Sequence, residues 1–244
     1  MADSYYRLGK TTEALAQYKQ LAEQAANPYQ EEAALRTAEI SYDKQDWNGA
    51  LEAFYRLNAL ASSRENTHIA RLGILRCCNQ LKRYQATIDI ADQILNDTPI
   101  SDDTRNEALY GRAKAYVSLG QWDKAQTDLK TLAKDVRTAQ GAEAKYLLAQ
   151  SYFEQGLLDD AEAEVMSFTK MNTQQQYWLA RALVLLSDIN VRRGENFQAR
   201  QYLLALQQNY MQQGDDIPSI VSARLEELDK SEQPMVKEEV EDED

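Results

Sequence analysis

Residues 115–125 read AYVSLGQWDKA, and residues 151–161 read SYFEQGLLDDA. Both stretches start with residues suited to a helix, reach a glycine at the sixth position and arrive at an alanine five residues later. Glycine readily adopts the left-handed backbone with which a helix commonly ends, so the chain is expected to reverse there and begin a second helix. Two such stretches in register predict a repeated helical hairpin.

The same unit is found six times, at intervals of 36 to 38 residues. A small residue early in the second helix serves as the anchor of each unit: Ala14, Ala50, Thr87, Ala125, Ala161 and Ala199. Five residues before each anchor lies a position that we name the turn column: Gly9, Gln45, Lys82, Gly120, Gly156 and Gly194. Because most of these are glycine, we expect a turn at all six positions.

Further columns of similar residues accompany the anchors. Seventeen residues before them stand Ala33, Ala70, Ala108, Ala144 and Ala182, and twelve before them stand Ala38, Leu75, Ala113, Ala149 and Ser187. Seven residues after them stand Leu21, Leu57, Ile94, Leu132, Phe168 and Leu206, and three before four of them stand Trp47, Tyr84, Trp122 and Leu158. Small residues allow paired helices to approach closely, and large ones fill the space between successive hairpins.

The columns predict an all-α fold, a right-handed superhelical solenoid of antiparallel helix pairs. The expected pairs are 29–45/47–63, 65–81/84–96, 102–119/122–136, 138–155/158–171 and 173–193/196–211. A partial first hairpin precedes them, with the end of one helix at 1–8 and its partner at 11–25. That makes about five and a half hairpins. Pro28 and Pro99 fall between hairpins, where a helix must stop.

Residues 1–211 resemble the tetratricopeptide repeat family. Its unit has a small residue, an aromatic, a turn with glycine, and then a second helix with an alanine followed by a large apolar residue. The period here is longer than the standard of about 34 residues, and Gln45, Lys82 and Thr87 match the pattern weakly. Longer units are similar in style to those of bacterial cell-envelope proteins, including the outer-membrane assembly lipoprotein type. The resemblance implies a protein-binding scaffold with a groove along the first helices.

The two ends differ from the interior. At the C-terminus, Ile217, Val221 and Leu228 belong to an apolar stripe that predicts a capping helix over 217–230. We therefore expect one helical repeat domain over 1–230, and an acidic, disordered tail over 231–244. At the N-terminus the half hairpin exposes an apolar edge, which favours self-association or a chain that is the C-terminal part of a longer array.

Charge and hydropathy restrict the partners. The formal net charge is -12, so nucleic acid and anionic membrane surfaces would be repelled. No run of about 18 apolar residues is present to span a bilayer. We expect a protein or peptide partner, no nucleic acid and no membrane span. The cell envelope, on its periplasmic side, and the cytoplasm both stay open as locations.

Catalytic residue patterns are not found. His68 is the single histidine, which excludes a histidine triad and a two-histidine metal site, and a solvated surface position is expected for it. Cys77 and Cys78 are adjacent in a predicted helix, where a packing role is expected. No metal, cofactor or catalytic residue is predicted. An all-helical catalytic toroid would need acids that converge in one pocket, so we rank it last.

Residues three, four and seven apart on the first helices share one face. By this spacing the groove is predicted to carry Arg36, Glu39, Asp43, Arg76, Gln80, Tyr110, Lys114, Ser118, Tyr146, Gln150, Glu154, Asp188 and Arg192. The aromatics Tyr110 and Tyr146 are the expected anchors for a partner. Family members that clamp acidic C-termini carry lysines and asparagines in the groove, and that pattern is not recognisable here.

Two functions follow from the sequence. The first is a non-catalytic scaffold that binds a partner peptide or helix in the concave groove. The second is a structural spacer or assembly subunit that forms the C-terminal part of a longer cell-envelope protein of this repeat type.

Overall fold

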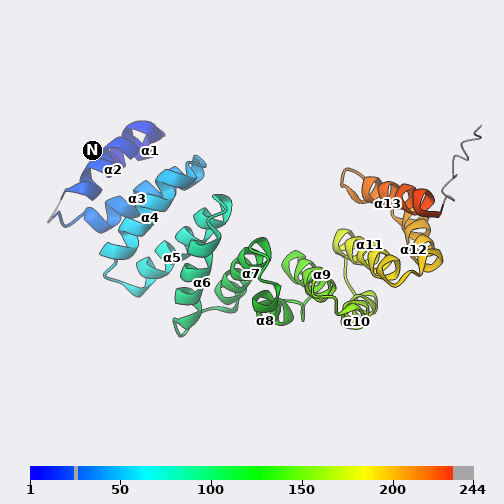
Figure 1. Cartoon of the computed structure of the whole chain (residues 1–244). Helices are drawn as coiled ribbons and strands as arrows, with labels where there is room; N and C mark the ends of the chain where they lie inside the picture. The colour runs from blue at the N-terminus through cyan, green and yellow to red at the C-terminus, as the bar shows by residue number, and fades with distance from the viewer. Residues whose placement is uncertain (25–26, 233–244) are drawn as a thin grey trace, which may run out of the picture. The chain divides into compact units, whose positions relative to one another are not determined.

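A computed structural model describes residues 1–24 and 27–232, and all its regular elements in this part of the chain are α-helices. The chain folds into two compact units, Met1–Leu129 and Lys130–Asp244. The first unit contains α1 (Ala2–Arg7), α2 (Thr11–Glu23), α3 (Gln30–Asp43), α4 (Trp47–Leu60), α5 (Arg64–Gln80), α6 (Tyr84–Asn96) and α7 (Asp102–Ser118). The second contains α9 (Ala139–Glu154), α10 (Leu158–Thr169), α11 (Gln176–Arg193), α12 (Asn196–Asn209) and α13 (Ile217–Glu232). The boundary falls within α8 (Trp122–Leu132) (Figure 1).

The predicted all-α hairpin repeat is confirmed, and the observed helix bounds lie within four residues of the expected ones. The largest difference is at α8, which ends at Leu132 rather than at 136. Residues after it form a packed connection in which Val136 is buried, and Thr138 then caps α9 by accepting a hydrogen bond from Gly141 N at 3.0 Å. Beyond Leu132 the backbone makes turn hydrogen bonds instead of helical ones, from Asp135 N to the Leu132 carbonyl at 3.2 Å and from Thr138 N to the Asp135 carbonyl at 3.4 Å. The predicted tail 231–244 lies outside the described residues from 233 onward, while 231 and 232 end α13.

All six residues of the turn column adopt a left-handed backbone. The φ angles are 72° at Gly9, 69° at Gly120, 76° at Gly156 and 80° at Gly194. The two residues that carry side chains follow the same geometry, with φ of 58° at Gln45 and 54° at Lys82. The repeat therefore sets the turn at every position, including those where the residue is not the favoured glycine.

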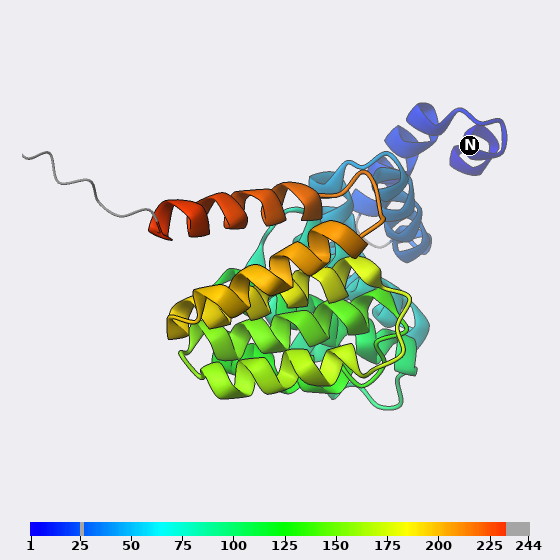
Figure 2. The same cartoon turned by 90° about the vertical axis from the view of Figure 1, so that its right-hand side faces the viewer.

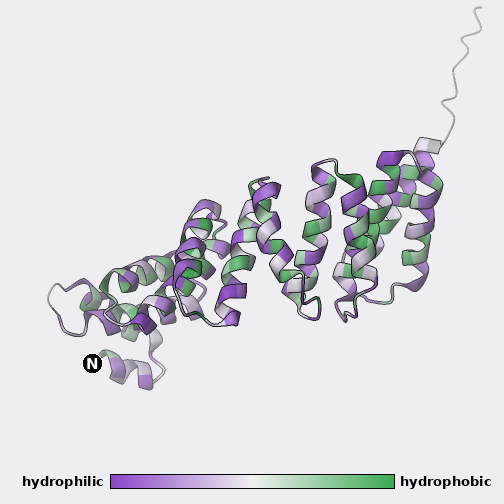
Figure 3. Cartoon of the chain, turned by 90° about the horizontal axis from the view of Figure 1, so that it is seen from below, coloured by the Kyte–Doolittle hydropathy of each residue, from purple (hydrophilic) through white to green (hydrophobic). Residues whose placement is uncertain are grey.

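The packing columns form the interior of each hairpin. Every anchor from Ala14 to Ala199 is fully buried, including Thr87, whose hydroxyl donates to the carbonyl of Arg83 at 3.1 Å. The large column is buried too, including Leu57 and Phe168, with the exception of the partly exposed Leu21. Figure 3 shows hydrophobic and hydrophilic residues alternating along the helices. The second helices α4, α6, α8 and α10 begin at Trp47, Tyr84, Trp122 and Leu158.

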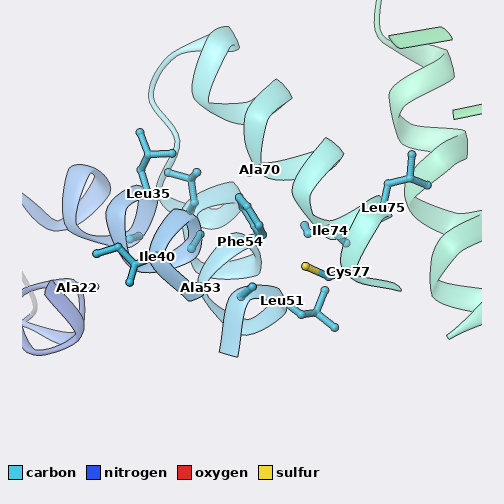
Figure 4. Close-up of a cluster of buried hydrophobic side chains, with 14 of the residues drawn as sticks. Ala22, Leu35, Ile40, Leu51, Ala53, Phe54, Ala70, Ile74, Leu75 and Cys77 are labelled. Carbon is cyan, nitrogen blue, oxygen red and sulfur yellow. The ribbon is translucent and has the colours of Figure 1, made fainter. Parts of the chain in front are cut away.

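In the first unit, each of α1 to α6 packs on the next helix in the chain. The core around α4 and α5 contains Phe54, Ile74 and Leu75 (Figure 4). Cys77 and Cys78 are fully buried, which agrees with the packing role expected for them. An ion-pair network ties α6, α7 and α8 together, because Arg112 reaches Asp128 at 2.7 Å and Asp92 at 2.5 Å.

In the second unit, α13 covers α12 and also contacts α11 (Figure 2). The apolar residues predicted for a capping helix perform this packing, since Ile217, Val221 and Leu228 are buried against α11 and α12. Lys145 on α9 is also buried, with Nζ 2.6 Å from Glu164 Oε1 on α10. Within the described residues, no helix has the length and apolar character required to cross a membrane.

Candidate protein-binding site

The first helices of successive hairpins contact one another and make a continuous layer within each unit. In the first unit α3 contacts α5, and α5 contacts α7; in the second, α9 contacts α11, and α11 contacts α13. We name the outer surface of this layer the first-helix face. The predicted groove residues belong to these helices, so the site is built on rigid elements rather than on loops.

The first-helix face of the first unit contains a hollow of about 490 Å³, which we name the N-pocket. Four predicted groove residues, Arg36, Glu39, Asp43 and Arg76, line it. The remaining lining residues are mostly apolar or aromatic: Tyr6, Tyr42, Phe54, Ile69, Leu72 and Gly73. The N-pocket thus combines an apolar floor with charged groups on α3 and α5.

Aromatic side chains build the floor of the N-pocket. Tyr42 contacts Trp47 and Phe54 edge to face, with ring centroids 5.1 and 6.3 Å apart. Phe54 points from α4 toward α5 (Figure 4), where it packs on the backbone of Gly73. Edge-to-face contacts of this kind hold rings in fixed positions, so the floor is preformed.

The two arginines of the N-pocket are held by carboxylates. Arg36 Nη1 lies 2.9 Å from Glu39 Oε2, and its Nε lies 2.8 Å from Glu32 Oε1. Arg76 makes a two-pronged pair with Glu107 on α7, at 2.6 and 2.8 Å. Asp43 has no ion-pair partner within the described part of the chain.

The first-helix face of the second unit contains a hollow of about 360 Å³, which we name the C-pocket. Four predicted groove residues, Tyr146, Gln150, Glu154 and Asp188, line it. The others are Phe153 on α9, Arg181, Val184 and Leu185 on α11, and Ile220, Ala223 and Arg224 on α13. The capping helix therefore forms one wall of the C-pocket.

An aromatic and arginine cluster borders the C-pocket. The ring of Tyr146 stacks on Trp178 with centroids 5.7 Å apart, and Trp178 meets Tyr177 edge to face at 4.9 Å. Arg181 lies over the Tyr146 ring, 5.4 Å from its centroid, and donates to the Tyr146 hydroxyl at 3.2 Å. Tyr146 itself is only 7% exposed, so the predicted anchor offers a partner little surface.

Asp188 and Arg224 connect two walls of the C-pocket. Arg224 Nε lies 2.8 Å from Asp188 Oδ1, and Arg224 Nη1 lies 3.0 Å from Glu227 Oε2. Burial raises the pKa of Asp188 above its ordinary value, although the charge of Arg224 acts in the opposite direction. The carboxylate is therefore held in a site that only partly compensates its charge.

The other predicted groove residues lie outside both pockets. Tyr110 and Lys114 are half-buried on α7, with Lys114 Nζ 5.8 Å from the Tyr110 ring centroid. Gln80 is exposed at the end of α5. Arg192 packs over the Phe153 ring at 3.9 Å and donates to the Phe153 carbonyl at 2.9 Å.

Several lining residues were missed by the sequence prediction, notably Tyr42, Arg181 and Arg224. A signal for two of them exists. Arg181 bonds to Tyr146 and Arg224 pairs with Asp188 at separations of 35 and 36 residues, which is about one repeat. Residues one period apart on first helices are neighbours, so complementary residues at this spacing predict contacts across the first-helix face.

The described residues contain no cluster of three or more histidine, cysteine or acidic side chains able to hold a metal ion. Burial raises the pKa of the Cys77 thiol to about 11, which keeps it protonated and unreactive. His68 differs from the expectation of a solvated position. It is half-buried, and its Nε2 lies 3.1 Å from Thr104 Oγ1 on α7, one repeat away.

A family model described as a tetratricopeptide repeat matches residues 1–65 and 110–167, which together make up just over half of the chain. The chain belongs to the tetratricopeptide repeat family. Repeats of this family are in general non-catalytic scaffolds for protein interactions. No curated protein sequence matches the chain.

Solved structures with a similar fold include other tetratricopeptide proteins. MamA from Desulfovibrio magneticus RS-1 has a TM-score of 0.55 at 15% identity, over 84% of this chain and 97% of that one. PilW, whose structure is described as that of a widely conserved type IV pilus biogenesis factor, has a TM-score of 0.53 at 22% identity, over 91% and 94%. Pseudomonas aeruginosa pilF has a TM-score of 0.56 at 15% identity, also over 91% and 94%. At these identities the likeness concerns the tetratricopeptide fold alone.

Proposed function

We propose that this tetratricopeptide chain is a non-catalytic scaffold that binds a peptide or helix of a partner protein on its first-helix face. The observation that carries the proposal is the N-pocket, where four residues predicted from spacing surround an aromatic floor. The C-pocket offers the second unit a comparable contact point. Interfaces concentrate binding energy where aromatic and arginine side chains meet in desolvated pockets.

The chemistry of both pockets suits side chains presented by an ordered segment. A helix presents residues three, four and seven apart on one face, and the predicted residues on α3 follow the same spacing. Each pocket places apolar lining beside charged groups, so an amphipathic segment can bury its apolar residues and pair its polar ones. Preformed walls reduce the entropy that is lost on binding.

The test uses substitutions that fill the pockets, and thermal unfolding checks that each variant is folded, because Leu72 packs against the core from a partly buried position. Leu72→Arg fills the N-pocket, and Ala223→Arg, at an exposed position of α13, fills the C-pocket. Matched controls carry arginine at exposed positions of second helices, Ala59→Arg on α4 and Gln201→Arg on α12. Partners captured from an extract of the organism of origin are identified, and their affinity for each purified variant is measured by calorimetry.

We expect the affinity of a captured partner for a pocket-filling variant to be lower by about tenfold or more, because a filled pocket removes a central contact. The two controls should bind like the parent chain. Equal affinity of all four variants would refute binding on the first-helix face.

The second candidate is a spacer or assembly subunit that forms part of a longer cell-envelope protein. It is favoured by exposed apolar side chains at the N-terminal edge, where Leu8 is 70% exposed and Tyr6 is 40% exposed. Such an edge suits contact with a further repeat or a second copy. Sedimentation velocity at increasing concentration tests it: self-association that Leu8→Lys abolishes would support assembly, and a concentration-independent monomer would count against it.

A further inference from the structure

Carboxylates outnumber arginines around the N-pocket. Its lining contains two acids and two arginines, and each arginine is paired with at least one further acid outside the lining. The set comprises Glu32, Glu39, Asp43 and Glu107 against Arg36 and Arg76. Arg7 and Lys44 directly follow the lining residues Tyr6 and Asp43 in the sequence, but neither lines the pocket. Lys44 instead donates a hydrogen bond to the Thr12 hydroxyl at 3.2 Å.

The arginines of the N-pocket are occupied by these acids. Arg36 bonds to two different carboxylates through Nε and Nη1. Arg76 uses Nε and Nη2 for both oxygens of Glu107, a geometry in which a guanidinium and a carboxylate satisfy each other. An incoming carboxylate could reach only the remaining N–H groups, and it would enter a site where four carboxylates already face two guanidinium groups. The pocket is therefore a poor receptor for an acidic group.

Asp43, by contrast, is exposed at the end of α3 and lies on the wall of the N-pocket without an ion-pair partner among the described residues. The same pocket is lined by the rings of Tyr6, Tyr42 and Phe54. Lysine and arginine have apolar stems and cationic heads, and their heads are attracted both to carboxylates and to aromatic faces. A free carboxylate next to aromatic rings has the complementary chemistry.

We propose that the N-pocket binds a lysine or arginine side chain of a partner protein, presented next to an apolar residue. The apolar neighbour packs against Leu72 and the aromatic floor, and the cationic head pairs with Asp43. The inference rests on the proposed function and adds the chemical class of the ligand. The proposed ligand group is cationic, whereas family members that clamp an acidic C-terminus bind an anionic group.

A phage-displayed library of random twelve-residue peptides, selected on the whole chain, tests the inference. Peptides recovered on the parent chain are expected to be enriched in lysine and arginine adjacent to leucine or an aromatic residue. The best peptide is then measured by fluorescence anisotropy against the parent, Asp43→Asn, Asp43→Lys and the control Ala59→Arg. Lysine at position 43 suits the end of a helix, where the dipole favours a cation, so thermal unfolding should show a folded variant.

The expected result is a loss of about tenfold or more in affinity for Asp43→Lys, a smaller loss for Asp43→Asn and no loss for the control. A partner peptide whose basic residue is replaced by glutamate should bind the parent weakly and recover affinity for Asp43→Lys. Such a charge swap distinguishes direct pairing from a general change in the fold.

Four outcomes would overturn the inference. Peptides whose affinity falls with Leu72→Arg, but which are not enriched in lysine or arginine, would support the proposed function and contradict the preference for a cationic side chain. Recovered peptides that ignore both Leu72→Arg and Asp43→Lys, or a selection without enrichment, would count against both proposals. A change of the sedimentation coefficient of the chain alone on Asp43→Lys would instead assign the pocket to a second copy.

Discussion

The ring of Phe54 occupies the space that a side chain at Gly73 would need. A Cβ at position 73 would lie 2.5 Å from three ring atoms, closer than any real contact of that kind. Gly73 is in the interior of α5, where glycine is otherwise unfavourable for a helix. The missing side chain thus allows the floor of the N-pocket to form.

Gly73→Ala is therefore expected to destabilise the first unit. Alanine gains about 1 kcal/mol of helix propensity, but overpacking a core costs roughly 1–3 kcal/mol, so the net change is a loss. Urea unfolding followed by far-UV circular dichroism measures it. The double variant with Phe54→Leu supplies the control, because a smaller side chain makes room for the methyl group. Additive effects in the double variant would show that the two residues do not compete for space.

The turn column gives a second prediction. Lys82 and Gln45 hold φ of 54° and 58°, a conformation that costs residues with a Cβ roughly 1–2 kcal/mol. Lys82→Gly should therefore raise the free energy of unfolding by about 0.5–1 kcal/mol, after the greater freedom of glycine in the unfolded chain is subtracted.

The reverse change, Gly120→Ala, serves as the matched control. A Cβ at position 120 meets no atom within 4 Å, so any loss of stability comes from the positive φ alone. A loss of about 1 kcal/mol is expected. If Lys82→Gly lowers the melting temperature, the backbone strain assigned to that turn is wrong.

The fold was predictable because each structural requirement recurs at a fixed spacing. Small residues such as Ala14 and Ala161 are fully buried at the same position of every repeat. One such residue predicts little, but the same residue type at five or six equivalent positions predicts the repeat. The pockets were only half predictable. Residues of one helix, such as Arg36 and Asp43, follow from helical spacing, whereas the contribution of Arg224 depends on how α13 packs against α11. Likewise, no local pattern shows that Tyr146 would be covered by Trp178 and Arg181.

Glu31 supplies a prediction on pH. Its carboxylate accepts hydrogen bonds from Asn66 Nδ2 at 2.7 Å and from Ser62 N and Oγ at 3.1 and 2.8 Å, which joins α3 to the start of α5. The bond from Asn66, followed by those from Ser62, lowers the pKa of Glu31 below its ordinary value of 4.5. The unfolded chain then binds the proton more tightly, so this stability is present above about pH 4.5 and is lost as the pH falls further.

Glu31→Gln should accordingly cost about 1 kcal/mol near neutral pH, the size of hydrogen bonds to a partly exposed charged group. The difference from the parent should shrink as the pH falls from about 4.5 through the lowered pKa of folded Glu31, below which its carboxyl group is neutral like the glutamine amide. Urea unfolding at several pH values measures it, with the exposed Glu52→Gln on α4 as control. A difference that stays constant down to pH 3 would contradict the role of the charge.

Asp188 should show the opposite pH dependence. Burial raises its pKa above the ordinary 3.8, so the folded chain holds the proton more tightly than the unfolded chain. As the pH rises from about 4 through the folded pKa, the parent should lose stability relative to Asp188→Asn, and above that pKa the difference should level off. Fluorescence of Trp178, in the same unit, reports this unfolding.

Arg224 should determine how large that loss is. Its guanidinium is the main cation that offsets the burial of Asp188, so in Arg224→Ala the loss of stability with rising pH should be larger and should extend to higher pH. Glu227→Gln is the matched control, because Glu227 is the other partner of Arg224 and is 62% exposed at its side chain. An exposed pair is worth little, so this control should follow the parent curve. If Arg224→Ala and Glu227→Gln gave the same profile, the pair between α11 and α13 would not hold the capping helix, and the wall it gives the C-pocket would depend on apolar packing alone.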